Sequence, residues 1–276
     1  MWLTRPTEPP PVPSFAPVEA NLREMMKFFA LAHPKGIVAE RDGLQLVSSG
    51  INFSPFNSAL LTMALPSLDS RDFELRVDMA AGFFRDRGER WSFWLCNDLL
   101  HPMVLRRVKW ILQQHRMRLS TEPPGMFADR LEPIVRSLPE DLLVSQVHDA
   151  ATRNDFSGVT ACTFDLPHSL CREVYQGEKS WSGSMRGWIG YVRGEPVTTC
   201  ATVIASGVIG VYTVGTMPHF RKRGYSELMM RYVLAEAQAQ TGIGSYILQA
   251  TPAGYPMYHK LGFRKATQFS IFLSEH

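Results

Sequence analysis

The segment Arg221-Lys222-Arg223-Gly224-Tyr225-Ser226 carries the residue types best suited to binding a charged ligand. Three consecutive basic residues attract an anion, and a glycine after them lets the backbone approach a phosphate without a Cβ in the way. If a helix begins at this glycine, its first N–H groups and the positive end of its dipole add to the attraction. The segment therefore predicts a phosphate or pyrophosphate site. A solvated basic turn that caps a helix is the alternative.

The elements on either side of this segment are those that such a site requires. The uncharged stretch 208–216 predicts a strand, and 224–240 has an apolar face at helical spacing. The rest of the C-terminal half of the chain, from about residue 142, alternates strands and helices. We expect strands at 142–147, 185–192, 196–204, 246–250 and 269–273, and helices at 152–164 (capped by Thr152), 167–176 and 255–261.

One stretch, 197–217, contains no charged residue and is long enough for a membrane window. Its Thr, Val and Ile content and the Ser206-Gly207 turn signal instead favour two buried strands joined by a tight turn. We therefore expect no membrane segment here.

The first half also alternates helices and strands but has no recognisable catalytic signature. Helices are expected at 21–32, 71–86 (N-cap Ser70, stop at Gly88) and 102–115, with strands at 44–47, 59–63 and 91–96. Prolines gather between 121 and 140, which places a domain boundary near Leu138. The expected domains are a Pro-rich lead-in (1–17), an N-terminal α/β domain (18–138) and a C-terminal domain (139–276).

Composition limits the class of protein. With 276 residues, of which 45% are hydrophobic and 20% charged, the chain has the make-up of a globular protein. A net charge of +3 argues against a nucleic-acid partner. The four cysteines are widely spaced without a C-x-x-C pair, so we expect free thiols in the cytoplasm and no metal site.

Two segments together resemble the Gcn5-related N-acetyltransferase (GNAT) superfamily. Arg221 to Ser226 is similar to its Gln/Arg-x-x-Gly-x-Gly/Ala motif, and Tyr255 to Phe263 is similar to its terminal Y-x-x-L-G-F segment. The resemblance covers residues 142–273, and Ser226 departs from it where the family has Gly or Ala. It implies a GNAT-like α/β fold with a mixed, mostly antiparallel sheet and flanking helices. The first half is then expected to be a degenerate second copy, without CoA, in tandem.

The resemblance implies acetyl-CoA as the acyl donor and no metal. The pyrophosphate would lie on the backbone of the basic loop, and the pantetheine arm would pair with the preceding strand, beside a splay between that strand and the one at 246–250. The cofactor-binding residues so implied are Val214, Gly215, Thr216, Arg221, Lys222, Arg223, Gly224, Tyr225 and Ser226. Tyr258 matches the tyrosine that protonates the departing thiolate.

The general base is not identified, because the strand 208–216 has no carboxylate where many relatives have one. Candidates are Glu173, Glu178, His168 and His148, or a water chain that ends at one of them. Each is more often a surface residue than a base.

The function expected is transfer of an acetyl group to a primary amine of a small molecule or peptide by direct attack. The alternatives are a non-catalytic acyl-CoA-binding or regulatory module and, more weakly, an interaction scaffold. We expect no membrane or nucleic-acid partner, and a homodimer stays open beside a monomer.

Overall fold

The structure, a computed structural model, describes residues 14–135 and 137–275. Most of the Pro-rich lead-in lies outside these residues, but its last two, Ala16 and Pro17, already belong to the first helix. The helices are α1 (Ala16–Ala30), α2 (Arg71–Arg87), α3 (Pro102–Leu105), α4 (Val108–Gln114), α5 (Ala150–Phe164), α6 (His168–Tyr175), α7 (Tyr225–Thr241) and α8 (Tyr255–Lys260).

The strands of the described residues form one continuous path. They are β1 (Ile37–Arg41), β2 (Leu44–Ser48), β3 (Ser58–Leu61), β4 (Ser92–Cys96), β5 (Met117–Thr121), β6 (Pro124–Ala128), β7 (Leu143–Gln146), β8 (Met185–Val192), β9 (Glu195–Ala205), β10 (Val208–Thr216), β11 (Tyr246–Gln249) and β12 (Arg264–Ser274). Their order is β1-β2-β3-β4-β12-β6-β11-β10-β9-β8-β7, with β5 beside β12. Among these strands β3/β4 and β10/β11 pair in parallel and the other pairs are antiparallel. The mixed, mostly antiparallel sheet with flanking helices is confirmed.

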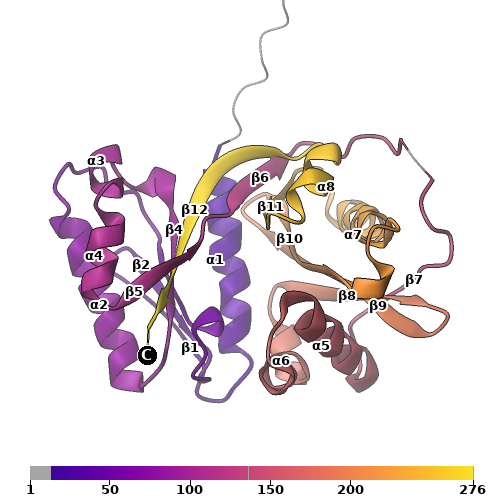
Figure 1. The fold of residues 1–276 in the computed structure, drawn as a ribbon, viewed down its shortest axis with the longest axis horizontal. Helices are drawn as coiled ribbons and strands as arrows, with labels where there is room; N and C mark the ends of the chain where they lie inside the picture. Colours follow the sequence, from indigo (N-terminus) through magenta and orange to yellow (C-terminus); the bar gives the residue numbers. More distant parts are fainter. Residues whose placement is uncertain (1–13, 136, 276) are drawn as a thin grey trace, which may run out of the picture.

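The two parallel pairs occupy equivalent places in the strand order of the two halves, and Figure 1 shows α2 and α7 toward opposite ends of the molecule. In each half, one long helix crosses from the first parallel strand to the second: α2 links β3 to β4, and α7 links β10 to β11. The first half thus repeats the strand–helix–strand arrangement of the second, and its origin as a degenerate second copy stays a prediction. In the first half, the chain segments that follow β3 and β4 are hydrogen-bonded to each other again. The Leu65 N–H donates to Leu99 O (2.7 Å) and the His101 N–H donates to Leu65 O (3.3 Å).

Strand β12 passes through both halves. Its first residues pair with β6, which also pairs with β11, and its last residues pair with β4 and β5 (Figure 1). The boundary near Leu138 stays a prediction, but the sheet crosses it in both directions, since β6 joins the second half and the end of β12 joins the first.

Helix α1 lies between the halves (Figure 1) and contacts β2 on one side and β9 and β10 on the other. It begins five residues earlier than predicted, with Pro17 in its first turn, where a proline is tolerated because its missing N–H would have no helical partner. Val18, Leu22 and Met26 are buried on one stripe of this helix.

Some predicted elements need correction. Strands β5 and β6 fill part of the proline-rich segment, and Pro124 begins β6, a position where a strand tolerates proline. The helix predicted over 102–115 is two helices, α3 and α4. Thr152 was predicted as the N-cap of α5, but the N-cap is Asp149 and Thr152 is the third residue of the helix. The Asp149 carboxylate accepts from the Thr152 N–H at 2.8 Å in a capping box.

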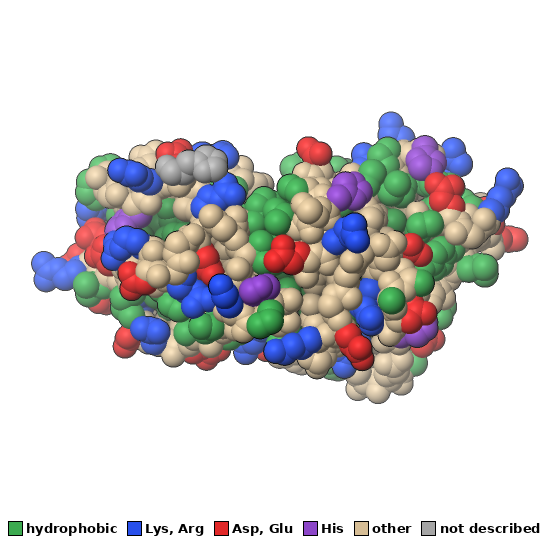
Figure 2. Space-filling model, turned by 90° about the horizontal axis from the view of Figure 1, so that it is seen from below, with side chains coloured by type: hydrophobic (Ala, Val, Ile, Leu, Met, Phe, Trp, Pro, Cys, Tyr) green, Lys and Arg blue, Asp and Glu red, His purple; other side chains and the backbone are tan. Residues whose placement is uncertain are grey.

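The uncharged stretch 197–217 forms the hairpin of β9 and β10, turned at Ser206 (φ 56°) and Gly207 (φ 72°). This confirms the two-strand prediction. No helix within the described ranges is long and apolar enough to span a membrane. Basic and acidic side chains are interspersed over the face shown in Figure 2.

Candidate functional site

Strands β10 and β11 pair at their beginnings and then separate. Their parallel register covers Ile209↔Tyr246 and Gly210↔Ile247, while β10 continues to Thr216 and β11 to Gln249. The later part of β10 is therefore bonded to β9 on one edge and lacks a β11 partner in the described register on the other. This is the splay that the resemblance implied.

The backbone groups of Val214 and Thr216 face this open edge. The Met217 N–H donates to Val197 O at 2.9 Å on β9, and backbone groups alternate between the two edges of a strand. Gly215 and Met217 therefore face β9, and the residues at 214 and 216 face away from it. On that edge the Arg221 side chain donates through Nε to Thr216 O at 3.0 Å.

The basic loop leads directly into α7. Lys222 has φ 63°, and Gly224, the N-cap residue of α7, has φ 95°, a left-handed conformation that glycine adopts without the steric cost other residues pay. The Leu228 N–H bonds to Gly224 O at 3.0 Å, which starts the helical ladder. As in any helix, the first-turn N–H groups have no partner within the helix, and they lie beside the basic side chains.

A cavity of about 680 Å³ opens at this loop. Six of the residues predicted to bind the cofactor line it, together with Phe220, Glu227 and Arg231 from the loop and α7, and residues of α8 and of the linker before β7. The full lining is Pro133, Val135, Thr216, Phe220, Arg221, Lys222, Gly224, Tyr225, Ser226, Glu227, Arg231, Ala253, Pro256, Met257 and Lys260. Four basic side chains against one carboxylate make the lining cationic.

The remaining predicted cofactor residues lie outside this lining. Val214 packs on the buried cluster between the sheet and α7, and a Cβ on Gly215 would overlap the Thr163 hydroxyl on the opposite face. The Arg223 guanidinium lies over the Phe220 ring at 5.5 Å. A contribution from these three residues through their backbones stays a prediction.

The lining also includes residues that sequence reasoning missed. Lys260 and Met257 come from α8, and Arg231 comes from the second turn of α7, where it forms an ion pair with Glu227 at 3.0 Å. Arg231 lies seven residues after Gly224, so helical spacing places it on the same face of α7, two turns on. That spacing could have predicted Arg231 from the sequence. No sequence signal predicted the packing of α8 beside α7, which brings Met257 and Lys260 to the cavity.

Tyr258 is buried with 7% of its surface exposed. It belongs to the cluster that contains Cys200, Phe263 and Leu248, and Val214 packs against that cluster. Its ring lies against Gly254, where a Cβ would come within 2.6 Å of it. Burial raises the pKa of the Tyr258 phenol well above its usual value, so the phenol carries its proton at neutral pH. The α8 residues that line the cavity are its neighbours Pro256, Met257 and Lys260.

The four candidate bases lie elsewhere. Glu173 and His168 are exposed on α6. His148 and Glu178 line a separate cavity of about 300 Å³ with Met185 and Arg186. Met185 on β8 pairs with Val203 on β9, and Val203 pairs with Gly210 near the start of β10. This cavity is therefore level with the start of β10, whereas the predicted cofactor residues Val214 to Thr216 lie at its end. The structure does not bring His148 or Glu178 to the splay.

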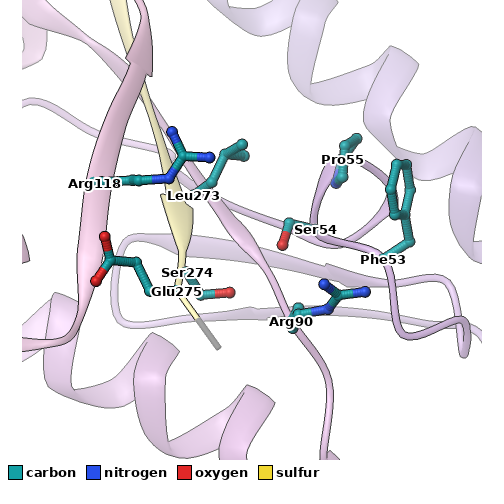
Figure 3. Close-up of a pocket in the computed structure, with 8 residues that line it drawn as sticks. All are labelled: Phe53, Ser54, Pro55, Arg90, Arg118, Leu273, Ser274 and Glu275. Atoms are coloured by element: carbon teal, nitrogen blue, oxygen red, sulfur yellow. The ribbon is translucent and has the colours of Figure 1, made fainter. Parts of the chain in front are cut away.

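A further cavity of about 600 Å³ lies in the first half (Figure 3). Phe53 and Pro55 form one side, and Arg118 of β5 reaches in from the other. It shares no lining residue with the cavity at the basic loop. Within the described residues no group of three or more His, Cys, Asp or Glu side chains is arranged to hold a metal ion.

Comparisons with known proteins agree with this description. Residues 205–266 match the family model of an acetyltransferase (GNAT) domain. No protein with a curated description matches the sequence. A structure described as a GCN5-related N-acetyltransferase from Kribbella flavida is similar with a TM-score of 0.66 and 17% identity, over 93% of this chain and 96% of that one.

Two further solved structures share the fold. A functionally unknown conserved protein from Staphylococcus epidermidis has a TM-score of 0.63 and 15% identity, over 88% of this chain and 96% of that one. A tandem GNAT protein from the clavulanic acid biosynthesis pathway has a TM-score of 0.55 and 12% identity, over 93% and 95%. Each alignment spans both halves, so the likeness extends over the whole fold and not over one half alone.

Proposed function

We propose that this chain, whose residues 205–266 match a GNAT acetyltransferase domain and whose fold is shared by GNAT structures, is an N-acyltransferase that moves an acetyl group from acetyl-CoA to a primary amine. The observation that carries the proposal is the cationic cavity at the start of α7, next to the unpaired edge of β10. It offers groups for phosphates and for an extended amide-containing arm at adjoining places.

In this proposal the pyrophosphate lies at the loop from Arg221 to Ser226. The first N–H groups of α7 donate to its oxygens, and Arg221, Lys222 and Lys260 supply positive charge around it. The pantetheine arm follows β10, where the N–H groups at 214 and 216 face the splay. The thioester would then lie between β10 and β11.

The chemical step proposed is direct attack. The lone pair of a neutral amine forms a bond to the thioester carbonyl carbon, the carbon–sulfur bond breaks, and the thiolate leaves. Tyr258 donates its phenolic proton to that thiolate, and the new amide loses the extra proton of the attacking nitrogen to a base or to water. Burial raises the pKa of the phenol and so makes it a weaker acid than a solvated tyrosine. The transfer therefore requires the thiolate to form beside the phenol in the same buried surroundings, where desolvation raises the basicity of the thiolate as well.

The acceptor is proposed to be a small molecule or peptide, for which the net charge of +3 sets no strong preference. The cysteines Cys96, Cys162, Cys171 and Cys200 are all free thiols, in keeping with a reducing compartment such as the cytoplasm.

A non-catalytic acyl-CoA-binding module is the second candidate, favoured by one specific observation. Strand β10 has no carboxylate, and the candidate bases His148 and Glu178 lie at its far end. Such a module would bind CoA through the same loop and release no thiol in the presence of amines.

Calorimetric titration with acetyl-CoA and CoA tests the donor site. We expect micromolar binding that Gly224→Glu abolishes, because the carboxylate would occupy the place of the pyrophosphate. Gly242→Glu is the matched control, since Gly242 caps the other end of α7, also with positive φ (73°), and has open space around it. No binding by the wild-type chain at millimolar ligand would contradict the proposal. Binding without thiol release across a panel of amines would favour the module.

A further inference from the structure

Strand β10 changes its alternation at a β-bulge. It pairs regularly with β9 up to Tyr212↔Ala201 and resumes at Gly215↔Thr199, so Thr213 and Val214 together oppose Cys200. Ile209, Val211 and Val214 all contact the cluster below α7, which means that the inward-facing set shifts by one residue at the bulge. Without that shift, the side chains from Val214 onward would lie on the opposite face of the sheet.

The bulge holds a strained residue. Thr213 has φ 52°, a left-handed conformation that a β-branched residue rarely adopts. Such a conformation persists only where surrounding contacts enforce it. From β9, the Thr199 hydroxyl donates to Thr213 O at 2.9 Å and the Thr198 hydroxyl donates to Gly215 O at 2.7 Å.

A second set of contacts comes from the other half of the molecule. Tyr212, the last residue before the bulge, donates its hydroxyl to Asn21 Oδ1 on α1 at 2.7 Å. Asn21 is fully buried, and its Nδ2 donates to Val203 O (3.0 Å), Ala205 O (3.1 Å) and Val208 O (3.3 Å). One side chain thus bonds both strands of the hairpin and the tyrosine that precedes the bulge.

The fit between α1 and β10 is close at Gly210. A Cβ at this position would overlap Asn21 Oδ1 and come within 2.6 Å of the Tyr212 ring. Only a residue without a side chain allows α1 to lie this near the strand. Gly210 also provides the last parallel pair with β11, so the Asn21 contact lies where the splay begins.

We propose that Asn21 of the degenerate half is a positioning residue for the donor site, acting through Tyr212 on the bulge that turns β10 toward CoA. This inference rests on the proposed function. It gives the first half a role in catalysis although it holds no basic loop of its own: its helix α1 keeps the donor strand in the conformation that binds the pantetheine arm. Loss of Asn21 lets the bulge relax, and the fraction of chains ready to bind CoA falls.

The test compares CoA binding and thermal stability in the full chain. Asn21→Ala and Tyr212→Phe, singly and together, are titrated with free CoA by calorimetry. If the binding-ready fraction falls to about a tenth, the apparent Kd rises about tenfold. Tyr212→Phe is the milder variant, since it removes one hydroxyl, and it keeps the test decisive if Asn21→Ala does not fold. Because both act through one contact, we expect the double variant to bind no more weakly than Asn21→Ala.

Asn57→Ala is the matched control. Asn57 is also fully buried, and its amide donates to Ile51 O (2.8 Å) and Arg90 O (2.7 Å) and accepts from the Ser49 N–H (2.8 Å), all within the first half. We expect it to lower Tm without changing the Kd for CoA. Wild-type Kd values in both Asn21→Ala and Tyr212→Phe would overturn the inference and leave the proposed function intact. Absence of CoA binding by the wild-type chain would overturn both.

Discussion

The hydroxyls of Thr216 and Ser226 lie 2.5 Å apart, which ties the end of β10 to the first turn of α7. Thr216 also bonds the Thr198 hydroxyl at 3.0 Å, so three hydroxyls connect β9, β10 and α7. Ser226 stands where the GNAT motif has Gly or Ala. Its departure from the motif therefore has a structural partner, since the extra oxygen is bonded to Thr216.

Replacement of Ser226 should separate its hydroxyl from its size. Ser226→Ala loses one hydrogen bond but keeps the space, so we expect the Kd for CoA to change by less than about threefold, with a stability loss of about 1 kcal/mol. Ser226→Leu adds bulk to the lining and should weaken CoA binding by more than about tenfold. Calorimetry and urea denaturation of the two variants check this, and equal Kd values for both would contradict it.

Tyr258→Phe should affect turnover and not donor binding. If the phenol protonates the thiolate, its loss lowers kcat by about 10²- to 10⁴-fold while the Kd for CoA stays the same. Tyr246→Phe is the matched control, because Tyr246 is also buried and its hydroxyl donates to Gln238 Oε1 on α7, outside the proposed reaction. Unchanged kcat in Tyr258→Phe, measured by thiol release, would remove the role from Tyr258.

Titration with CoA should give about one site per chain. In the first half, the strands equivalent to β10 and β11 rejoin at Leu65 and Leu100, and the loop before α2 carries Asp69 instead of a basic run. Both features work against a phosphate and an inserted pantetheine arm. Residual binding in Gly224→Glu would reveal a second site and contradict this expectation.

Stability should fall in alkali through the buried thiols. Burial raises the pKa of Cys96 and Cys200 to about 12 and that of Cys171 to about 11, against an ordinary value of 9.0. At a pH between the ordinary pKa and the raised pKa of a thiol, the unfolded chain loses a proton that the folded chain keeps. The unfolding free energy therefore falls as pH rises from about 9 to about 11, by up to about 1.4 kcal/mol per pH unit for each thiol.

Urea denaturation between about pH 8 and pH 11 measures this slope. Cys200→Ala should make it shallower by roughly the share of one thiol, whereas Cys162→Ala, at an exposed position, should leave it unchanged. Each slope is taken from one variant measured at several pH values. A pH-independent loss of stability, caused by the small cavity that Cys200→Ala leaves, therefore does not change it. An identical slope in wild type and Cys200→Ala would show that the Cys200 thiol is not held neutral.

Local sequence signals predicted the elements around the site well. The stretch 208–216 is a strand as expected, and Gly224 is the N-cap of α7, where the basic loop ends and the apolar helix face begins. What local pattern could not predict is pairing over long distances. Arg264 to Gln268 alternate weakly and were not recognised as strand, because this part of β12 pairs with β6 and not with a sequence neighbour.

The cavity lining divides in the same way. Residues contiguous with the motif were predicted, whereas Lys260 and Met257 were missed because only the packing of α8 beside α7 brings them to the loop. Asn21 had no sequence signal at all. An asparagine in a helix is usually a surface residue, and the four hydrogen bonds of Asn21 appear only once α1 lies against the hairpin of β9 and β10.

The passage of β12 through both halves has a consequence for biosynthesis. Strand β4 ends at Cys96, and its neighbour β12 begins at Arg264, roughly 170 residues later. At ordinary elongation rates a ribosome needs about 10 to 30 s to make that length. During this time the first half has an open β4 edge, and β6 waits for both of its partners. Nascent chains should therefore depend on chaperones until the last strand emerges.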